Sequence, residues 1–223
     1  MNTGVLYIVA TPIGNLEDIT LRAIKALNEA DLIACEDTRV TRKLLNRYNI
    51  NKPIISYFQH SKLARISQIV EDLKSGKNVS LVTDAGTPGI SDPGNKLVEE
   101  AVMNNIQVIP IPGPSGLTAL ASVAGIDMQR FTFLGFPPHK KGRETFFKEV
   151  VNAKYPVIYF DSVHRVIKNL ELLRSLEPEK KIILGRELTK MFEEILRGSA
   201  EEILEYFEKN RNKIKGEFVI IIY

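Results

Sequence analysis

Residue types that could bind a ligand or take part in catalysis lie directly after the apolar runs of this sequence. Residues 84–94, Asp-Ala-Gly-Thr-Pro-Gly-Ile-Ser-Asp-Pro-Gly, hold three glycines, two prolines and two aspartates. Glycines let the backbone approach a ligand closely, and prolines reduce the entropy lost when a loop is ordered. Asp84 directly follows an apolar run. A carboxylate at this position can bind a ribose hydroxyl or an ammonium group. We therefore expect residues 86–91 to bind a ligand and Asp92 to cap the following helix.

Three more stretches follow apolar runs in the same way: residues 10–15, 112–116 and 185–190. Open α/β sheets bind ligands at the carboxyl ends of their strands, so each stretch is a candidate binding loop. An ordinary turn between a strand and a helix explains the first equally well. A rigid linker with Ser115 as a helix cap explains the second, and an exposed turn explains the third, Gly-Arg-Glu-Leu-Thr-Lys. On the residues alone, these alternatives stay open.

Composition excludes several classes of protein. Cys35 is the only cysteine, which excludes a disulfide framework and favours a reducing compartment, so we expect a cytoplasmic protein. The first residues carry no basic segment and no apolar stretch reaches the length of a membrane span, so we expect neither a signal peptide nor a membrane protein. The histidines and the cysteine lack metal-ligand spacing, and we expect no metal. A net charge of +3 is too small by itself to indicate nucleic acid.

Apolar runs alternate with amphipathic stretches along the first half of the chain. This alternation predicts a mainly parallel sheet with helices on both faces. The expected strands cover residues 6–10, 32–35, 53–58, 79–83 and 107–111, and the expected helices cover residues 18–29, 38–47, 61–75 and 93–104. The run Pro-Ile-Pro-Gly-Pro at residues 110–114 is the densest cluster of residues that interrupt helices and strands. We place the domain boundary there, with domains over residues 1–112 and 113–223.

The same alternation restarts in the second half. The expected strands cover residues 131–134, 157–160, 182–184 and 218–222, with room for a further short strand at 193–198. The expected helices cover residues 115–124, 143–152, 164–176 and 200–210. The fold class is therefore α/β, with two α/β domains of similar size.

Several of these stretches together resemble one protein family. Residues 6–20, Leu-Tyr-Ile-Val-Ala-Thr-Pro-Ile-Gly-Asn-Leu-Glu-Asp-Ile-Thr, resemble the opening of the tetrapyrrole (corrin/porphyrin) methylase family. Within it, they are similar to the branch that methylates bacterial small-subunit ribosomal RNA. The remaining motifs that fit this branch lie at residues 35–39, 84–94, 112–115, 135–143 and 186–190. The match therefore covers nearly the whole chain.

The resemblance implies two α/β domains with a cleft for S-adenosylmethionine (SAM) between them, in a homodimer. It implies SAM as the methyl donor and 2′-O-methylation of a cytidine ribose in the decoding centre of 16S rRNA, in the small ribosomal subunit. By position, the implied SAM contacts are Thr11, Pro12, Asp84, Gly86, Gly89, Ile90, Ser91, Pro114, Ser115, Phe160 and Leu188. A methyltransferase for a tetrapyrrole or another small molecule is the alternative, and a SAM-binding or ribosome-assembly module without activity is the third possibility.

A ribose 2′-hydroxyl is a poor nucleophile, so some group should accept or orient its proton. The candidate catalytic residues follow expected strands, and they are Asp37, Glu187 and Lys190. Basic side chains suit the phosphates of RNA, a planar guanidinium above all. The candidate RNA-binding residues are Arg39, Arg42, Lys43, Lys141 and Arg143.

Two features depart from the pattern of the family. Relatives often have Tyr-Glu-Ser-Pro-His-Arg where residues 159–165 have Tyr-Phe-Asp-Ser-Val-His-Arg, so Asp161 keeps the acid while the proline is lost. The shape of that loop is therefore open. Longer relatives also extend beyond the last strand, whereas this chain stops at Tyr223. We expect the basic clusters at residues 39–47 and 139–143 to supply RNA affinity instead.

Overall fold

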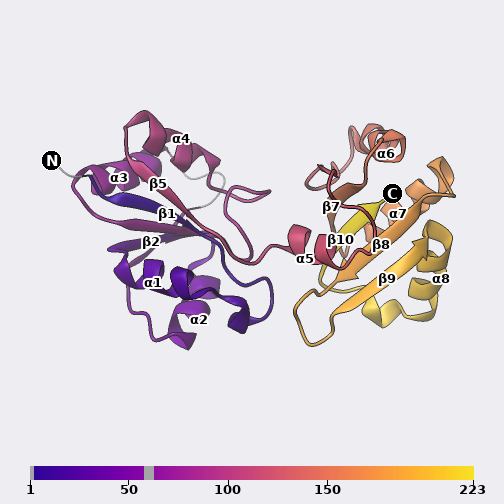
Figure 1. Ribbon diagram of the computed structural model, residues 1–223, viewed down its shortest axis with the longest axis horizontal. Helices are drawn as coiled ribbons and strands as arrows, with labels where there is room; N and C mark the ends of the chain where they lie inside the picture. The colour runs from indigo at the N-terminus through magenta and orange to yellow at the C-terminus, as the bar shows by residue number, and fades with distance from the viewer. Residues whose placement is uncertain (1–2, 58–62) are drawn as a thin grey trace. The chain divides into compact units, whose positions relative to one another are not determined.

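The computed structural model describes residues 3–57 and 63–223. Its packing divides the chain into two compact units, Met1–Ser115 and Gly116–Tyr223, called unit 1 and unit 2 below (Figure 1). The expected strand at 53–58 and the expected helix at 61–75 each include residues outside the described ranges. Each unit is described by itself.

Unit 1 contains a sheet in which all paired strands run parallel, as the sequence predicts. The order across the sheet is β3-β2-β4-β1-β5. Its strands are β1 (Val5–Val9), β2 (Leu32–Cys35), β3 (Ile54–Ser56), β4 (Val79–Val82) and β5 (Gln107–Ile111). Because the strands are parallel, the loops that follow them all emerge at one edge of the sheet.

Helices cover both faces of the unit 1 sheet (Figure 1). The helices α1 (Leu21–Glu29) and α2 (Thr38–Arg47) share one apolar cluster, and α3 (Leu63–Lys74) and α4 (Asn95–Met103) share the other. The helix that follows β4 therefore lies on one face of the sheet. The helices that follow the neighbouring strands β1 and β2 lie on the opposite face. Such a divergence is the topological switch point at which open α/β sheets bind ligands.

The starts of α1 and α2 follow from side-chain capping, whereas the start of α4 does not. Thr20 caps α1 by accepting a hydrogen bond from the Ala23 N–H at 3.1 Å, after a short 3₁₀ helix, η1 (Leu16–Asp18). The prediction that Asp92 caps the next expected helix is wrong, because α4 begins only at Asn95 with Gly94 at the cap position. Gly94 has a φ of +155° and makes no side-chain cap, so the loop continues past Asp92 before the helix starts.

Unit 2 contains a mixed sheet of order β6-β7-β10-β8-β9. Only β6 and β7 pair in parallel, and β10 runs antiparallel to both β7 and β8, an arrangement that the alternation of strands and helices did not specify. The strands are β6 (Thr132–Phe133), β7 (Val157–Ser162), β8 (Lys181–Arg186), β9 (Glu194–Ser199) and β10 (Glu217–Ile222). The short strand that the sequence allowed at 193–198 is therefore present as β9.

The helices of unit 2 are divided unevenly between the faces of its sheet. Phe147, Leu170 and Phe207 belong to one buried cluster against β7 and β10, and they come from three different helices. The opposite face carries a short helix that begins directly after Ser115. The helices are α5 (Gly116–Ser122), α6 (Arg143–Asn152), α7 (Val166–Leu176) and α8 (Ala200–Lys209), followed by a 3₁₀ turn, η2 (Arg211–Lys213). Within the described ranges, no helix is long and apolar enough to span a membrane.

Candidate functional site

Two of the predicted binding loops are joined by backbone hydrogen bonds at the switch point of unit 1. The Thr11 N–H donates to the Gly86 carbonyl at 2.9 Å, and the Gly86 N–H donates to the Thr11 carbonyl at 3.0 Å. The Thr11 hydroxyl, which is buried, also donates to the Thr83 carbonyl at 3.1 Å. These bonds hold the loops after β1 and β4 together beyond the ends of their strands.

The third predicted loop of unit 1 meets the same place. A Cβ built on Gly86 lies 3.6 Å from the Ile13 side chain and 3.9 Å from the Pro114 carbonyl oxygen. A Cβ built on Gly113 lies 3.1 Å from the Ala10 side chain. The loops after β1, β4 and β5 therefore converge on Gly86, whose φ of +82° favours glycine. Predicted SAM contacts from all three loops lie in this region.

The loop from residue 83 to residue 94 has an irregular backbone. Gly86, Gly89 and Ser91 all have φ values in the left-handed region, at +82°, +83° and +65°. Ser91 is the unusual member, since residues with a Cβ rarely adopt this conformation. Ile90 lies between them with its side chain 48% exposed. The loop therefore presents an apolar side chain to solvent beside the converging loops.

Two carboxylates fix the start of α2 at the same edge of the sheet. Asp84 accepts a hydrogen bond from the Asp37 N–H at 3.0 Å, which links the end of β4 to the end of β2. Asp37 caps α2 by accepting from the Arg39 N–H at 2.8 Å. The Arg39 guanidinium also binds both oxygens of Asp37, at 2.6 Å in the shortest contact. The geometry thus makes Asp37 a structural anchor as well as a candidate catalytic group.

The two carboxylates have opposite pKa shifts. The hydrogen bonds from Arg39 lower the pKa of Asp37 to about 2. Partial burial raises the pKa of Asp84, and the negative charge of Asp37 contributes in the same direction, although the bond from the Asp37 N–H opposes both. A carboxylate with a pKa of about 2 is a weak base, so Asp37 is poorly suited to accept a proton at neutral pH.

One contact beside these carboxylates was not expected from the sequence. The hydroxyl of Thr83 donates to the carboxylate of Glu36 at 3.2 Å, which forms a second link between the ends of β4 and β2. Glu36 directly precedes Asp37, and two signals could have identified it: its position after a strand and its place in the motif at residues 35–39. The link adds a further acidic group to this edge of the sheet.

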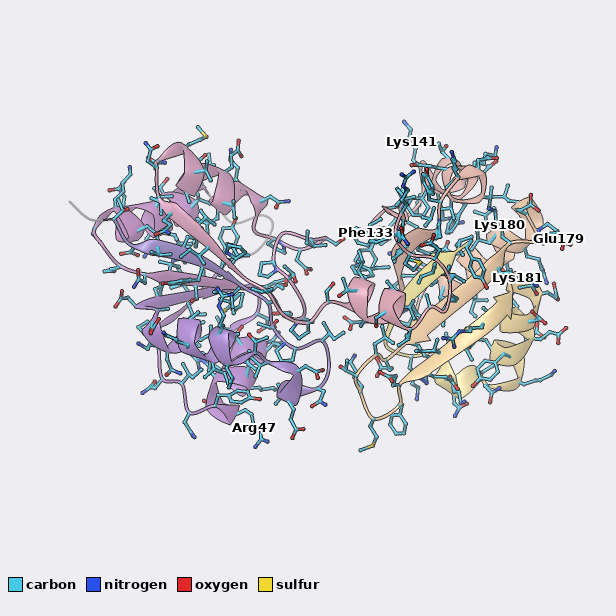
Figure 2. The ribbon with its side chains drawn as sticks, viewed as in Figure 1. Arg47, Phe133, Lys141, Glu179, Lys180 and Lys181 are labelled. Atoms are coloured by element: carbon cyan, nitrogen blue, oxygen red, sulfur yellow. The ribbon has the colours of Figure 1, made fainter. Side chains whose placement is uncertain are left out.

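The exposed face of α2 carries all three predicted RNA-binding residues of unit 1. Residues 39, 42, 43 and 47 recur at the spacing of one helical face, and all four are exposed. Arg39 is paired with Asp37, but Arg42, Lys43 and Arg47 have no ion pair within residues 3–57 and 63–223. Figure 2 shows Arg47 pointing away from the sheet at the end of α2. The result is a band of positive charge that begins at the edge where the loops converge.

The predicted SAM contacts of unit 2 lie on the face of its sheet that α5 covers. Gly116 of α5 lies against this face, since a Cβ built on it is 3.9 Å from the Phe160 ring and 3.2 Å from Val219. Leu188 is buried, and its side chain reaches to within 3.0 Å of a Cβ built on Gly185. The Leu120 side chain of α5 lies 2.9 Å from the same Cβ position, so Phe160 and Leu188 both lie beside α5 in unit 2.

The other two candidate catalytic residues form an ion-pair cluster after β8. Lys190 donates to Glu187 at 2.9 Å and to Glu217 at 3.5 Å. Burial lowers the pKa of Lys190, but the bond to Glu187 and the charge of Glu217 outweigh it and raise that pKa above its usual value. Lys190 therefore keeps its proton at neutral pH and is suited to donate a hydrogen bond.

Two residues of this cluster were missed by the sequence analysis. Glu217 lies on β10, where the register pairs its neighbour Phe218 with Arg186 at the end of β8. Gly216 leaves the space that the Glu187 carboxylate occupies, since a Cβ built there would lie 1.7 Å from a Glu187 oxygen. Both residues lie about thirty positions after Glu187 in the sequence. The antiparallel pairing that brings them close to it leaves no local pattern in the sequence from which it could be predicted.

Asp161 keeps the acid of the family motif as a buried group in β7. It accepts hydrogen bonds from the Asn169 amide at 2.8 Å and from the Ser162 N–H at 2.7 Å. Burial raises the pKa of Asp161 above its usual value, although both bonds oppose that shift. Its contacts show a role in packing α7 against the sheet. Among the described residues, no group of three or more histidine, cysteine, aspartate or glutamate side chains is arranged to hold a metal ion.

Comparison with known proteins assigns this arrangement to a family. The model of the tetrapyrrole (corrin/porphyrin) methylases matches residues 5–204. The chain belongs to this family. It is 42% identical to the ribosomal RNA small subunit methyltransferase I of Thermotoga maritima, over 98% of both chains. It is 43% identical to the protein of the same name from Halalkalibacterium halodurans, over 98% of this chain and 75% of that one.

Solved structures confirm the methylase fold. Diphthine synthase superimposes with a TM-score of 0.76 at 15% identity, covering 98% of this chain and 89% of the other. Cobalt precorrin-4 methyltransferase superimposes with a TM-score of 0.72 at 17% identity, covering 97% and 94%. The chain is thus a methyltransferase of two α/β units, and SAM is the methyl donor that the family implies.

The converging loops of this methylase can be tested at Gly86. Gly86→Ala places a methyl group beside Ile13 and Pro114 and forces alanine to a φ of +82°. Gly125→Ala is the matched control, because Gly125 has a φ of +74° and no atom within 4 Å of its Cβ position. Both variants should lose about 1–2 kcal/mol of unfolding free energy from backbone strain. Only Gly86→Ala should also weaken SAM binding, by about tenfold, measured by calorimetry. Equal SAM affinity in the two variants would remove Gly86 from the donor site.

The pKa of Asp37 predicts a pH-dependent contribution to stability. Asp37→Asn keeps a capping oxygen but removes the charge that pairs with Arg39. Because the folded pKa of about 2 lies below the unfolded value, the stabilising effect is present above about pH 4 and disappears as pH falls toward 2. Urea unfolding of both proteins from pH 7 to pH 3 should show the difference shrinking. In an Arg39→Gln background the pH dependence should be much weaker, and an unchanged dependence there would contradict the assignment.

Proposed function

We propose that this methyltransferase moves the methyl group of SAM to the 2′-oxygen of a cytidine ribose in the decoding centre of 16S rRNA. The names of the full-length relatives at 42–43% identity support a substrate in the RNA of the small ribosomal subunit. The choice of a cytidine, and of its 2′-oxygen as the acceptor atom, rests on the family resemblance of the motifs at residues 6–20 and 84–94. With a bacterial ribosomal substrate, we expect the enzyme to act in the cytoplasm and as a homodimer.

The observation that best supports an RNA substrate is the positive charge on α2 that has no acidic partner among the described residues. Thr38–Arg47 contains no acidic residue, and Arg42, Lys43 and Arg47 lack ion pairs within the described ranges. Lysines of the other unit 1 helices behave differently: Lys25, Lys74 and Lys96 are each paired with a glutamate on their own helix. Exposed cations that lack acidic partners on one helical face suit the regularly spaced phosphates of a nucleic acid.

The loops around Gly86 fit a methyl donor. Backbone hydrogen bonds join Thr11 to Gly86 in unit 1, and the Pro114 carbonyl lies near the position that a Cβ on Gly86 would take, so Gly86 leaves open the volume that a side chain would fill. Asp84 offers a carboxylate for a ribose hydroxyl or the ammonium group of the donor. These residues would hold SAM, with Pro12, Gly89, Ile90, Ser91 and Ser115 beside them. Phe160 and Leu188 of unit 2 stay predictions for the adenine pocket.

Bound SAM supplies an electrophilic methyl carbon on a positively charged sulfur for an in-line displacement. The chain has to orient the ribose oxygen and keep water away from it. Lys190 is held protonated between Glu187 and Glu217, so we assign it to donate a hydrogen bond that orients the acceptor. Glu187 positions Lys190. Asp37 positions Arg39 for a phosphate, and Lys141 and Arg143 of unit 2 bind further phosphates.

Methyl transfer from labelled SAM to small ribosomal subunits that lack the modification tests the proposal. The product is mapped by nucleotide and by atom, with the protein as it exists and with free 16S rRNA as a second acceptor. We expect label on one cytidine 2′-oxygen in the decoding centre. Label on a base, or only on a tetrapyrrole precursor offered in parallel, would overturn the proposal. SAM binding without any transfer would favour a module without activity.

The basic face of α2 makes a separate prediction about salt dependence. A triple variant with Arg42, Lys43 and Arg47 changed to Gln should bind 16S rRNA more weakly, and the slope of log affinity against log salt should fall by about 2. The control changes Lys25, Lys74 and Lys96 to Gln, which removes the same charge from unit 1 but from paired residues. Filter binding at several salt concentrations measures both. If the two triple variants have equal slopes, α2 is not a phosphate-binding face.

A further inference from the structure

An exposed aromatic ring lies in the loop between β6 and α6. Phe136 is 49% exposed, although it stands between Gly135, with a φ of +66°, and the buried Pro137. A large apolar side chain gains free energy by leaving water, so an exposed phenylalanine held between ordered neighbours needs an explanation. Neither the proposed donor site nor the predicted RNA contacts include it.

The backbone of this loop is fixed on both sides of the ring. The Gly135 carbonyl accepts a hydrogen bond from the Phe160 N–H at 2.8 Å. The Pro137 carbonyl accepts from the Arg165 guanidinium at 2.7 Å, and the same guanidinium donates to the Ser162 hydroxyl at 3.1 Å. Pro137 and Pro138, which follow Phe136 in sequence, restrict the loop further. The ring is therefore presented by an ordered backbone, which lowers the entropy that binding would cost.

The ring is supported from one side by other aromatic residues. Its centroid lies 5.4 Å from that of Phe160, at an interplanar angle of 57°, and Phe160 lies 5.0 Å from Phe133 at 67°. Figure 2 shows Phe133 in unit 2, where β6 lies next to β7. Phe160 and Phe133 are both partly buried, and Phe136 is the exposed member of this chain of three rings.

Positively charged side chains follow Phe136 a few residues later in the same loop. His139, Lys140 and Lys141 are exposed, and residues 135–143 contain no acid. Neither Lys140 nor Lys141 has an ion pair among the described residues, whereas Lys148 of the following helix is paired with Glu144 at 2.7 Å. Figure 2 shows Lys141 extending away from the body of unit 2. One ordered loop therefore offers an aromatic ring and, a few residues on, free cations.

This combination selects among possible partners. A protein partner or a second copy of this chain would need about 800 Å² of buried surface on each side, and one half-exposed ring supplies a small part of that. Single-stranded RNA needs less, because each unpaired base can stack on one ring while cations hold the neighbouring phosphates. Base pairing hides that stacking surface inside a duplex, so the loop should distinguish unpaired from paired RNA.

We propose that Phe136 stacks on an unpaired base of the substrate RNA, on the strand whose phosphates Lys140 and Lys141 bind. The inference rests on the proposed function for the identity of the RNA. It adds a requirement that the charges alone do not impose, namely that the strand near the methylation site is single-stranded when it binds. Phe136 is a positioning residue for the RNA and has no part in methyl transfer itself.

The test compares three variants with the wild-type protein. Phe136→Ala removes the ring, Phe136→Tyr retains it, and Phe131→Ala removes another exposed phenylalanine, 40% exposed, that has no ring contact among the described residues. The probes are a single-stranded 16S rRNA fragment spanning the decoding centre and the same fragment annealed to its complement. Phe136→Ala should weaken binding of the single strand by about 5- to 100-fold, with no change in the salt slope. Phe136→Tyr and Phe131→Ala should bind like the wild type, and duplex affinity should be equal in all four proteins.

Several outcomes would overturn the inference. Unchanged single-strand affinity in Phe136→Ala would remove the ring from RNA binding, and an equal loss on the duplex would show that it does not stack on an unpaired base. A parallel loss of SAM affinity in calorimetry would assign the ring to the donor site, and a shift in sedimentation would assign it to a contact between copies. These binding results are independent of the proposed function, which is tested by methyl transfer. If the wild-type protein transfers no methyl group to the RNA while Phe136→Ala still binds the RNA more weakly, the proposed function fails and the inference about Phe136 stands.

Discussion

The pair of backbone hydrogen bonds between Thr11 and Gly86 is the constraint on which the rest of the site depends. The strands β1 and β4 are neighbours, but the chain leaves them toward opposite faces of the sheet, so their loops would separate immediately if nothing joined them. Buried backbone groups must also find partners. The bridge satisfies them and keeps the two loops together while Pro114 approaches from the third. The convergence of the loops is therefore fixed by backbone, which changes little with side-chain identity.

Charge is organised differently in the two units. At the edge of the unit 1 sheet, Asp84 binds the Asp37 N–H and Asp37 binds Arg39, so the acidic groups are used to fix the start of α2. The remaining cations of that helix are left without acidic partners. In unit 2, Lys190 is enclosed by two glutamates and stays protonated. Cations that are left unneutralised suit a polyanion, whereas an enclosed cation suits a fixed role beside a reacting group.

Much of unit 1 could be predicted from the sequence, because parallel strands and their helices have strong local patterns. The five strands and the basic helix α2 all follow from hydrophobic periodicity and spacing. The prediction for Asp92 failed because a good capping residue followed by proline is only a local preference, and the loop after β4 continues to Gly94. The antiparallel pairing of β10 could not be predicted, since strand direction depends on partners distant in sequence.

The sequence by itself determined which residues are available: a loop rich in glycine and proline after β4, a helix with basic residues on one face, and charged residues after β8. It did so because composition, spacing and hydrophobic period are local properties. Only the tertiary structure decided which of them meet. The register of β10 brings Glu217 and Gly216 to Lys190 and Glu187, and the bond from Arg39 lowers the pKa of Asp37 enough to make it a weak base. Such contacts depend on how strands far apart in the chain align, and that alignment is set by the packing of the whole unit.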